Sequence, residues 1–195
     1  MRFIRARLNS LLTRTGVFTA DRGGTAAIEF AVIAPLMITL YLGGVEISDA
    51  IAASRKTTLV ARTAADLVAQ ALEIGNSDKD EVLNAAFFVA SPYGTGNLTV
   101  VISSIKIDNA GAATVKWSDA KNGTARTVGS SVQLDAALAV PNTSLILGEA
   151  TYNYVPAFGE AITGPISLTD QIYMRPRNGP CVKRNTPSNP SAMNC

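Results

Sequence analysis

The spacing of apolar and polar residues changes along the chain and predicts two helices followed by strands. Residues 23–45 are apolar on every side apart from Glu29. Beyond them, small and apolar residues recur at alternating spacings of four and three, which is one stripe of an α-helix. We expect a continuous helix from Ala26 to Ile74, roughly 73 Å long at 1.5 Å per residue, that ends at Gly75-Asn76. The predicted stripe contains Ile47, Ile51, Ser54, Thr58, Ala61, Ala65, Val68 and Leu72.

A second predicted helix begins at Ser77–Glu81, where Ser77 or Asp78 would cap it, and ends before Pro92-Tyr93-Gly94. Its apolar face comprises Val82, Leu83, Ala86, Phe87 and Ala90. Alternating residues then predict strands, and Ser131–Val140 fits a short strand or a helical turn. Helices followed by strands indicate an α+β domain, with the long N-terminal helix packed on an antiparallel sheet. The expected strands are Leu98–Ile107, Ala113–Trp117, Leu145–Val155 and Ile166–Arg175.

The first apolar run is a candidate membrane span, because about 20 apolar residues in an α-helix cross the hydrocarbon core of a bilayer. Five arginines precede the run, and Glu46 and Asp49 follow it. This asymmetry predicts a cytoplasmic N-terminus and an extracytoplasmic C-terminal domain. Two alternatives stay open: a buried helix of a soluble protein, and a secretory signal peptide cut after the apolar stretch, near Asp49-Ala50.

Composition argues against several classes of function. The 195 residues include no histidine, which removes the commonest general base and the commonest zinc ligand. A nucleophilic serine in Gly129-Ser130-Ser131 would need Lys116 or Lys121 as its base. The net charge of +2 is too small to indicate nucleic-acid binding. We therefore predict that the chain is not an enzyme and that it has no catalytic residues, metal, cofactor or nucleic-acid partner.

The aromatic residues of the predicted strands offer one binding hypothesis. Trp117, Tyr152 and Tyr154 could form an adhesin or carbohydrate-binding surface. Aromatic side chains on strands more often belong to a core, and we favour that interpretation here.

Both cysteines, Cys181 and Cys195, lie in the last 15 residues. A metal site built on two thiolates would need carboxylate ligands, and no acidic cluster lies nearby in the sequence. A disulfide in an oxidising compartment is the better interpretation. The surrounding segment, residues 178–195, is rich in Pro, Asn and Ser, and we expect it to bury no core.

Glu29 is the most informative residue, because a carboxylate in an apolar membrane helix costs a few kcal/mol and needs a partner. The string Gly23-Gly24-Thr25-Ala26-Ala27-Ile28-Glu29-Phe30 resembles the processing site of type IV-like prepilins. In that family a prepilin peptidase cuts after a glycine, and a glutamate is fifth in the mature chain. The resemblance implies cleavage between Gly24 and Thr25. The new α-ammonium group, with an unperturbed pKa of about 8, would then be a natural partner for the Glu29 carboxylate.

The wider string from Ala26 to Pro35 is similar to the TadE-like family of tight-adherence (Tad/Flp) pilus assembly, whose members are minor pilin-like proteins. The resemblance covers residues 24–177 and implies a pilin-like fold, with Glu29, Phe30 and Pro35 as assembly residues. We expect a helix kink at Pro35, which lacks a backbone donor. Further likeness lies in Trp117, Glu149–Pro156, Gly164, Ile166–Asp170 and Tyr173–Arg177.

These inferences divide the chain into four parts. Residues 1–24 form a basic cytoplasmic leader that is cleaved, 25–46 a transmembrane helix, 47–177 an extracytoplasmic pilin-like domain and 178–195 a tail with the disulfide. The resemblance implies a bacterial inner-membrane location with a periplasmic C-terminal domain. It also implies four partners: the membrane, prepilin peptidase, other pilin-like subunits and the Tad secretion machinery. Two functions stay open: a minor pilin that enters a surface pilus, and a membrane-anchored periplasmic scaffold that stays out of the filament.

Overall fold

The structure is a computed structural model that describes residues 23–160 and 164–185. It forms two compact units that meet between Val45 and Glu46. Helix α2 (Gly23–Ala69) provides all the described residues of the first unit and continues into the second. The predicted leader lies outside the described residues, apart from Gly23 and Gly24 at the start of α2.

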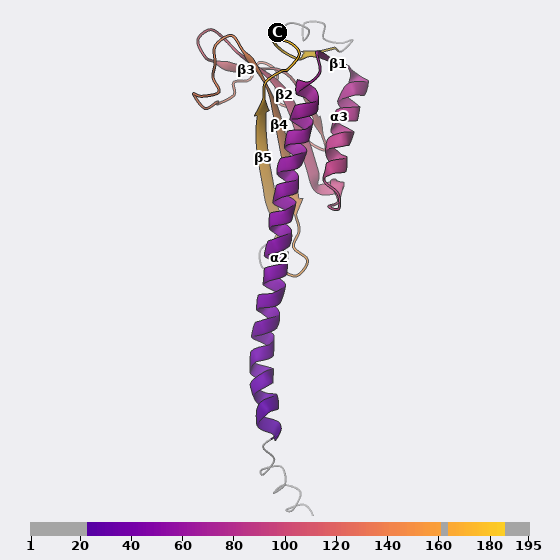
Figure 1. Cartoon of the computed structure of the whole chain (residues 1–195), viewed down its shortest axis with the longest axis vertical. Coiled ribbons are helices and arrows are strands. Elements are labelled where there is room, and N and C mark those ends of the chain that lie inside the picture. The colour runs from indigo at the N-terminus through magenta and orange to yellow at the C-terminus, as the bar shows by residue number, and fades with distance from the viewer. Residues whose placement is uncertain (1–22, 161–163, 186–195) are drawn as a thin grey trace, which may run out of the picture. The chain divides into compact units, whose positions relative to one another are not determined.

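The second unit is built on a four-stranded antiparallel sheet with the order β3-β2-β4-β5 (Figure 1). A small parallel sheet of β1 and β6 lies apart from it. Together with the long apolar helix, the antiparallel sheet confirms the predicted α+β class. Strand β2 has the predicted bounds, and β3 runs four residues further than expected, to Lys121. The strands are β1 (Glu73–Ile74), β2 (Leu98–Ile107), β3 (Ala113–Lys121), β4 (Ser144–Tyr154), β5 (Ile166–Met174) and β6 (Lys183–Arg184).

Helix α3 (Asn76–Val89) and the short 3-10 helix η1 (Thr95–Asn97) connect β1 to β2. The N-cap of α3 is Gly75, so the cap predicted at Ser77 or Asp78 is too late in the sequence. Asp78 lies in the first turn, and its carboxylate accepts the backbone N–H of Gly75 at 2.8 Å. The predicted apolar face of α3 is confirmed at Leu83, Ala86 and Phe87, which are buried. Buried side chains of α2 and α3 form one core with those of the sheet. The strand residues of this core are Leu98, Val100, Ile102, Trp117, Ile146 and Ala150.

Small residues let α2 lie unusually close to the sheet. Gly148 is in β4, and a Cβ atom built on it would lie 2.5 Å from the backbone oxygen of Ala61 and 2.9 Å from the Cβ atom of Ala65. Real carbon contacts are longer than this, so only glycine fits between strand and helix at this point. The alanine face of α2 and the glycine of β4 are therefore two halves of one contact.

The predicted stripe of α2 is right at Ala61, Ala65 and Val68 and wrong at both ends. Ile47 is 64% exposed and Leu72 is 60% exposed. Leu72 lies beyond the end of α2 at Ala69, and Ile47 lies before the first buried residue of the helix, Ala53. The residues of α2 that are buried are Ala53, Thr57, Val60, Ala61, Ala64, Ala65, Val68 and Ala69.

Helix α2 also ends five residues before the predicted Ile74. Its last turn is closed by other backbone groups: Ala71 N–H donates to Val68 O at 3.0 Å, and Arg177 N–H donates to Ala69 O at 2.8 Å. The chain then extends so that Glu73 and Ile74 pair with β6. The C-terminal segment, which sequence pattern did not connect to this helix, therefore sets its end.

A smaller apolar cluster lies on the other face of the sheet, since Leu145 and Leu147 alternate with Ile146 along β4. The segment between β3 and β4 covers it with Val132, Leu134 and Leu138. In the predicted strand or helical turn of residues 131–140, Ser131 makes a single bridge to Thr114 and a turn follows. Arg126 holds this segment to β4 through a bidentate pair with Glu149, at 2.6 and 2.7 Å.

The expectation that residues 178–195 bury no core is wrong for the described part, which ends at residue 185. Val182 is 1% exposed within the main core, and its carbonyl oxygen accepts the Trp117 indole N–H at 2.8 Å. Arg184 is 4% exposed and pairs with Asp119 at 2.7 Å. It also donates to the carbonyl oxygen of Ile74 at 3.0 Å. Composition marked the segment as a tail, but these residues close one end of the domain.

The Gly148 contact predicts a specific sensitivity to added volume. Gly148→Ala should lower the free energy of unfolding by about 1 to 3 kcal/mol, because the new methyl group overpacks the contact with α2. Gly96→Ala is the matched control, since nothing lies within 4 Å of a Cβ atom at that position. Denaturant unfolding of the detergent-solubilised chain, followed by Trp117 fluorescence, measures both. Equal stability of the two variants would contradict this packing.

The Arg184 contacts predict that removing this side chain destabilises the domain. Arg184→Ala should cost about 3 to 5 kcal/mol, because Asp119 is left with an unpaired, partly buried charge. Arg177→Ala breaks an exposed pair with Asp66 and should cost less than about 1 kcal/mol. The same unfolding assay compares them, and a loss at Arg184 no larger than that at Arg177 would refute a structural role for the C-terminal segment.

Candidate functional site

The predicted processing and assembly residues all lie in the first unit, on the N-terminal part of α2. Gly24, Thr25, Glu29, Phe30 and Pro35 are all exposed. They therefore form a helix surface open to the surroundings. Large apolar side chains cover this stretch on every side, each more than half exposed; they are Ile28, Phe30, Val32, Ile33, Leu36, Met37, Ile38, Leu40 and Tyr41.

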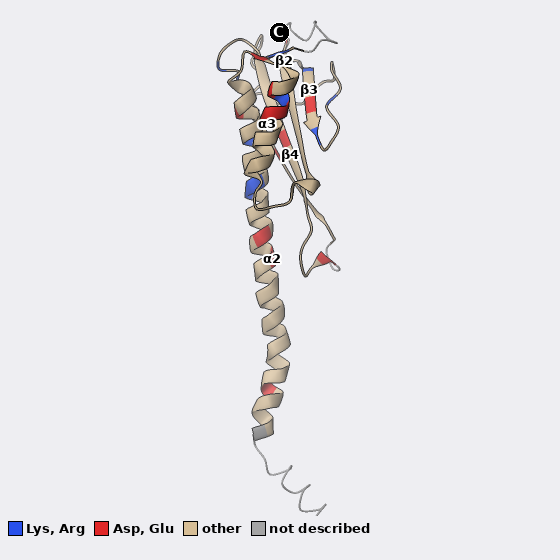
Figure 2. Ribbon diagram, turned by 90° about the vertical axis from the view of Figure 1, so that its right-hand side faces the viewer, with Lys and Arg blue, Asp and Glu red and all other residues tan. Residues whose placement is uncertain are grey.

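Glu29 carries the only charge of the first unit's described residues, 23–45. Figure 2 shows this part of α2 as uncharged apart from one acidic position. The helix places Glu29 one turn beyond Thr25, at 3.6 residues per turn. Cleavage at Gly24 would add an α-ammonium group at the same end of the helix.

This helix is long and apolar enough to cross a membrane, and it is the one helix of the described residues that passes this test. None of its apolar window is buried within the protein. An exposed apolar surface of this extent is unfavourable in water, which favours a lipid or protein environment around it.

Pro35 lies inside α2. Having no N–H group, it leaves the Ala31 carbonyl oxygen without the usual helical donor. One turn later, the Thr39 hydroxyl donates to the Pro35 carbonyl oxygen at 2.8 Å. Threonine bonds of this kind occur in helices and often bend them slightly. The kink at Pro35 itself stays a prediction.

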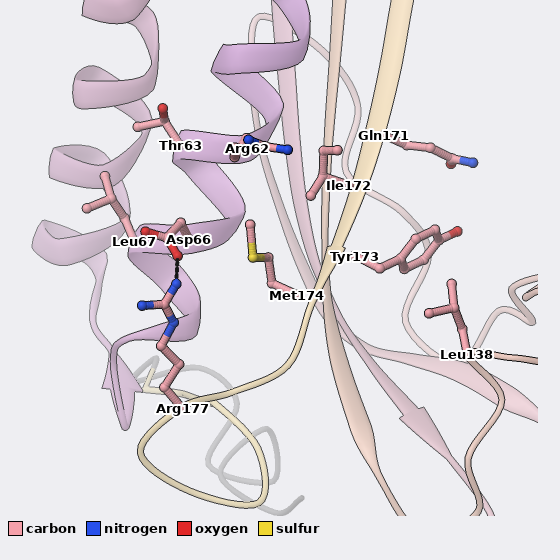
Figure 3. Close-up of a pocket in the computed structure, with 10 residues that line it drawn as sticks. All are labelled: Arg62, Thr63, Asp66, Leu67, Leu138, Gln171, Ile172, Tyr173, Met174 and Arg177. Atoms are coloured by element: carbon pink, nitrogen blue, oxygen red, sulfur yellow. Dashed lines mark hydrogen bonds and ion pairs between the residues drawn. The ribbon is translucent and has the colours of Figure 1, made fainter.

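The second unit has a groove between α2 and the edge strand β5, with a volume of about 720 Å³ (Figure 3). Ile172 and Met174 line it from β5, and the ion pair of Asp66 with Arg177 closes one side. Burial raises the pKa of Tyr173, which also lines the groove. In the part of the chain that the structure describes, no group of three or more acids and cysteines could hold a metal ion. The lining of the groove mixes apolar side chains with polar and charged ones, among them Arg62, Asp66 and Gln171.

Two of the residues considered for a catalytic serine–lysine pair, Ser130 and Lys121, make other contacts. The Ser130 hydroxyl donates to the carbonyl oxygen of Thr127 at 2.7 Å. The Lys121 ammonium donates to Asn84 and lies 4.5 Å from the centre of the Phe87 ring. These contacts assign both residues to local structure.

The strand aromatics are core residues, as favoured above. Trp117 is 5% exposed and Tyr154 is 7% exposed, so neither presents a ring surface to a ligand. Tyr152 is half-buried and packs on Tyr93, with ring centres 5.9 Å apart.

A cluster around Glu46 was missed by sequence analysis, which treated this residue only as a charge flanking the apolar run. Glu46 Oε1 accepts the backbone N–H groups of Phe158 and Gly159, the latter at 2.9 Å. One turn further along α2, Asp49 O accepts the Tyr93 hydroxyl at 3.3 Å. Burial and the negative charges of Asp49 and Glu46 raise the pKa of Tyr154. The only sequence signal was the proline and glycine content of residues 155–165.

Of the two cysteines in the predicted disulfide, the structure describes Cys181. Cys181 is 7% exposed, between Pro180 and the core residue Val182. Cys195 lies outside the described residues, so the pairing stays a prediction.

Comparison with protein families finds one match: residues 24–66 fit the family described as TadE-like protein. Comparisons with curated proteins and with solved structures find no match. The family match confirms the TadE-like resemblance at its N-terminal end. It begins at Gly24, contains every predicted processing and assembly residue, and includes most of the helix face that packs on the sheet. The likeness inferred for residues 67–177 stays a prediction.

Proposed function

We propose that this chain is a minor pilin-like subunit or assembly component of a Tad/Flp-type pilus, processed by prepilin peptidase after Gly24. The observation that carries the proposal is the TadE-like match over residues 24–66. The match includes the part of α2 that lies in the first unit, which is apolar on all sides and carries only Glu29 as a charge. The family is related to pilus assembly rather than to catalysis, and the chain acts in this proposal as a structural component.

Before processing, α2 anchors the protein in the inner membrane. The arginine-rich leader keeps the Gly24–Thr25 bond at the cytoplasmic face, and the second unit lies in the periplasm. An oxidising periplasm would allow Cys181 and Cys195 to pair. Gly24 suits cleavage because it has no side chain to obstruct a protease.

After processing, the Thr25 α-ammonium group offers a partner for Glu29. In an isolated subunit the two groups lie one turn apart on the same helix. In an assembly the carboxylate of one subunit can instead bind the ammonium group of its neighbour. A buried pair between subunits would set the axial register of their helices, as single buried polar groups do in other helical assemblies.

The alternative is an inner-membrane-anchored periplasmic scaffold of the secretion machinery that does not enter the filament. The same helix and the same domain serve this role, and only the final location differs. Cell fractionation separates the two: protein in sheared surface filaments supports a pilus subunit, and protein confined to membranes supports a scaffold.

Two substitutions test processing and assembly separately. Gly24→Leu should block cleavage and leave a precursor 24 residues longer than the mature chain, visible on an immunoblot of membranes. Glu29→Ala should be processed, yet its incorporation into filaments should fall at least tenfold, because the charge that pairs with the new ammonium group is gone. N-terminal sequencing of the membrane protein should begin at Thr25 in both the wild type and Glu29→Ala.

Gly43→Leu is the matched control for the first variant. It lies on the same helix with nothing within 4 Å of the added Cβ atom, and it should be cleaved normally. A wild-type N-terminus at Met1, or at a residue beyond Val45, would refute prepilin processing. Normal filament incorporation of Glu29→Ala would refute the role of the carboxylate in assembly.

A further inference from the structure

We infer that the connection from β4 to β5 rests on the membrane surface beside α2, with Phe158 as its lipid-contacting side chain. The described part of this connection is residues 155–160, called here the interfacial loop. The inference relies on the proposed membrane anchoring and adds a second point of contact with lipid, made by the second unit. Its partner is the headgroup and upper acyl region of a bilayer.

The interfacial loop is fixed to α2 by Glu46. The carboxylate oxygen Oε1 accepts two consecutive backbone N–H groups, those of Phe158 and Gly159. A Cβ atom on residue 159 would lie 2.6 Å from the other Glu46 oxygen, so glycine is needed for the carboxylate to reach the backbone. These two bonds hold the backbone at Phe158 against a defined position of the helix.

That position is where the helix leaves the hydrocarbon. The 22 residues from Gly24 to Val45 cover about 33 Å at 1.5 Å per residue, against a hydrocarbon thickness of about 30 Å. Glu46 follows directly and is the first charge after Glu29. A glutamate is far more stable among headgroups and water than in hydrocarbon. The loop bound to it therefore lies at the level of the headgroups.

The side chains of the loop suit this level. Phe158 is 62% exposed and Val155 is 41% exposed, although both are apolar. Ile47, next to Glu46 on α2, is 64% exposed. Residues 155–165 include no lysine or arginine, as expected of a short segment on the extracytoplasmic side.

Tyrosines next to the loop add a feature typical of membrane interfaces. The Tyr93 hydroxyl donates to the Asp49 backbone, and Tyr152 packs on Tyr93. Aromatic residues with one apolar and one polar side concentrate where lipid meets water. Phe158, whose backbone N–H bonds to Glu46, is an exposed aromatic side chain held three residues before Asp49 on the helix.

Tryptophan fluorescence in vesicles tests this contact, with the full chain reconstituted in phosphatidylcholine that carries bromine on its acyl chains. Trp117 is the only tryptophan of the chain and is buried, so the wild type gives the background signal. Phe158→Trp should lose fluorescence strongly with bromines near the headgroup and less with bromines near the chain ends. Leu36→Trp, in the middle of the apolar run, should show the reverse order.

Val128→Trp is the matched control. Val128 is 57% exposed, close to the value for Phe158. The adjacent Gly129 bonds to Val115, and strand register connects Val115 through Ile105 to Leu145. Leu145 and Tyr154 lie nine residues apart on β4, or about 30 Å at 3.3 Å per residue. Val128→Trp should therefore lose no more fluorescence than the wild type.

The outcomes separate this inference from the proposed membrane anchoring. In one outcome Leu36→Trp is quenched, but Phe158→Trp loses no more fluorescence than Val128→Trp. This outcome would overturn the membrane contact of the interfacial loop and would still support the membrane span. This is also the result expected if a second copy of the chain covers Phe158. Failure to quench either variant would overturn both. Adding Glu46→Ala to Phe158→Trp should abolish the preference for bromines near the headgroup, because the loop is no longer fixed to the helix.

Discussion

Helix α2 has two parts with different surfaces, and each part needs a different environment. The surface changes between Val45 and Glu46. Up to Val45 its surface is apolar on all sides apart from Glu29, and an aqueous environment would leave that surface exposed. From Glu46 onward only a narrow face is buried, and the other faces carry charges. The first stretch is suited to lipid or to neighbouring helices, and the second to a sheet of the same chain. The remaining features of the domain follow from how that narrow face is packed.

The face is made mainly of alanine, so the helix gains stability from close approach rather than from large side chains. Gly148 has no side chain, which lets the sheet approach Ala61 and Ala65 closely. Larger residues of α2, such as Ile51 and Leu59, are exposed. Charged side chains then attach the irregular segments to this framework. Glu46 holds the β4–β5 connection, Arg126 holds the β3–β4 connection to Glu149, and Arg184 holds the C-terminal segment to Asp119. Each of the three bonds to backbone or carboxylate groups of a segment distant in sequence.

Sequence pattern predicted the features that depend on local chemistry. The bounds of β2, the apolar face of α3 and the apolar run around Glu29 all follow from periodicity and length. It missed what depends on contacts distant in sequence. The regular spacing extended the predicted stripe to Ile47 and Leu72, whereas the buried face of α2 begins at Ala53 and the helix ends at Ala69. The composition of the C-terminal segment predicted that it would bury no core. Two residues, Val182 and Arg184, make the contacts that join it to the domain, and two residues hardly change a composition. The role of Glu46 depends on two backbone N–H groups more than 100 residues away, which no local pattern reveals.

The central claim is that α2 belongs to two environments, with its second part forming the spine of the second unit. Two fragments test this most directly: one that begins at Glu46, and one that begins at Gly75 and lacks the helix. The first should be soluble without detergent and unfold in one cooperative transition, because the alanine face covers the sheet. The second should aggregate, because Ile102, Ile146 and their neighbours lose their cover. Solubility and cooperative unfolding of the second fragment, or a need for detergent in the first, would contradict the account.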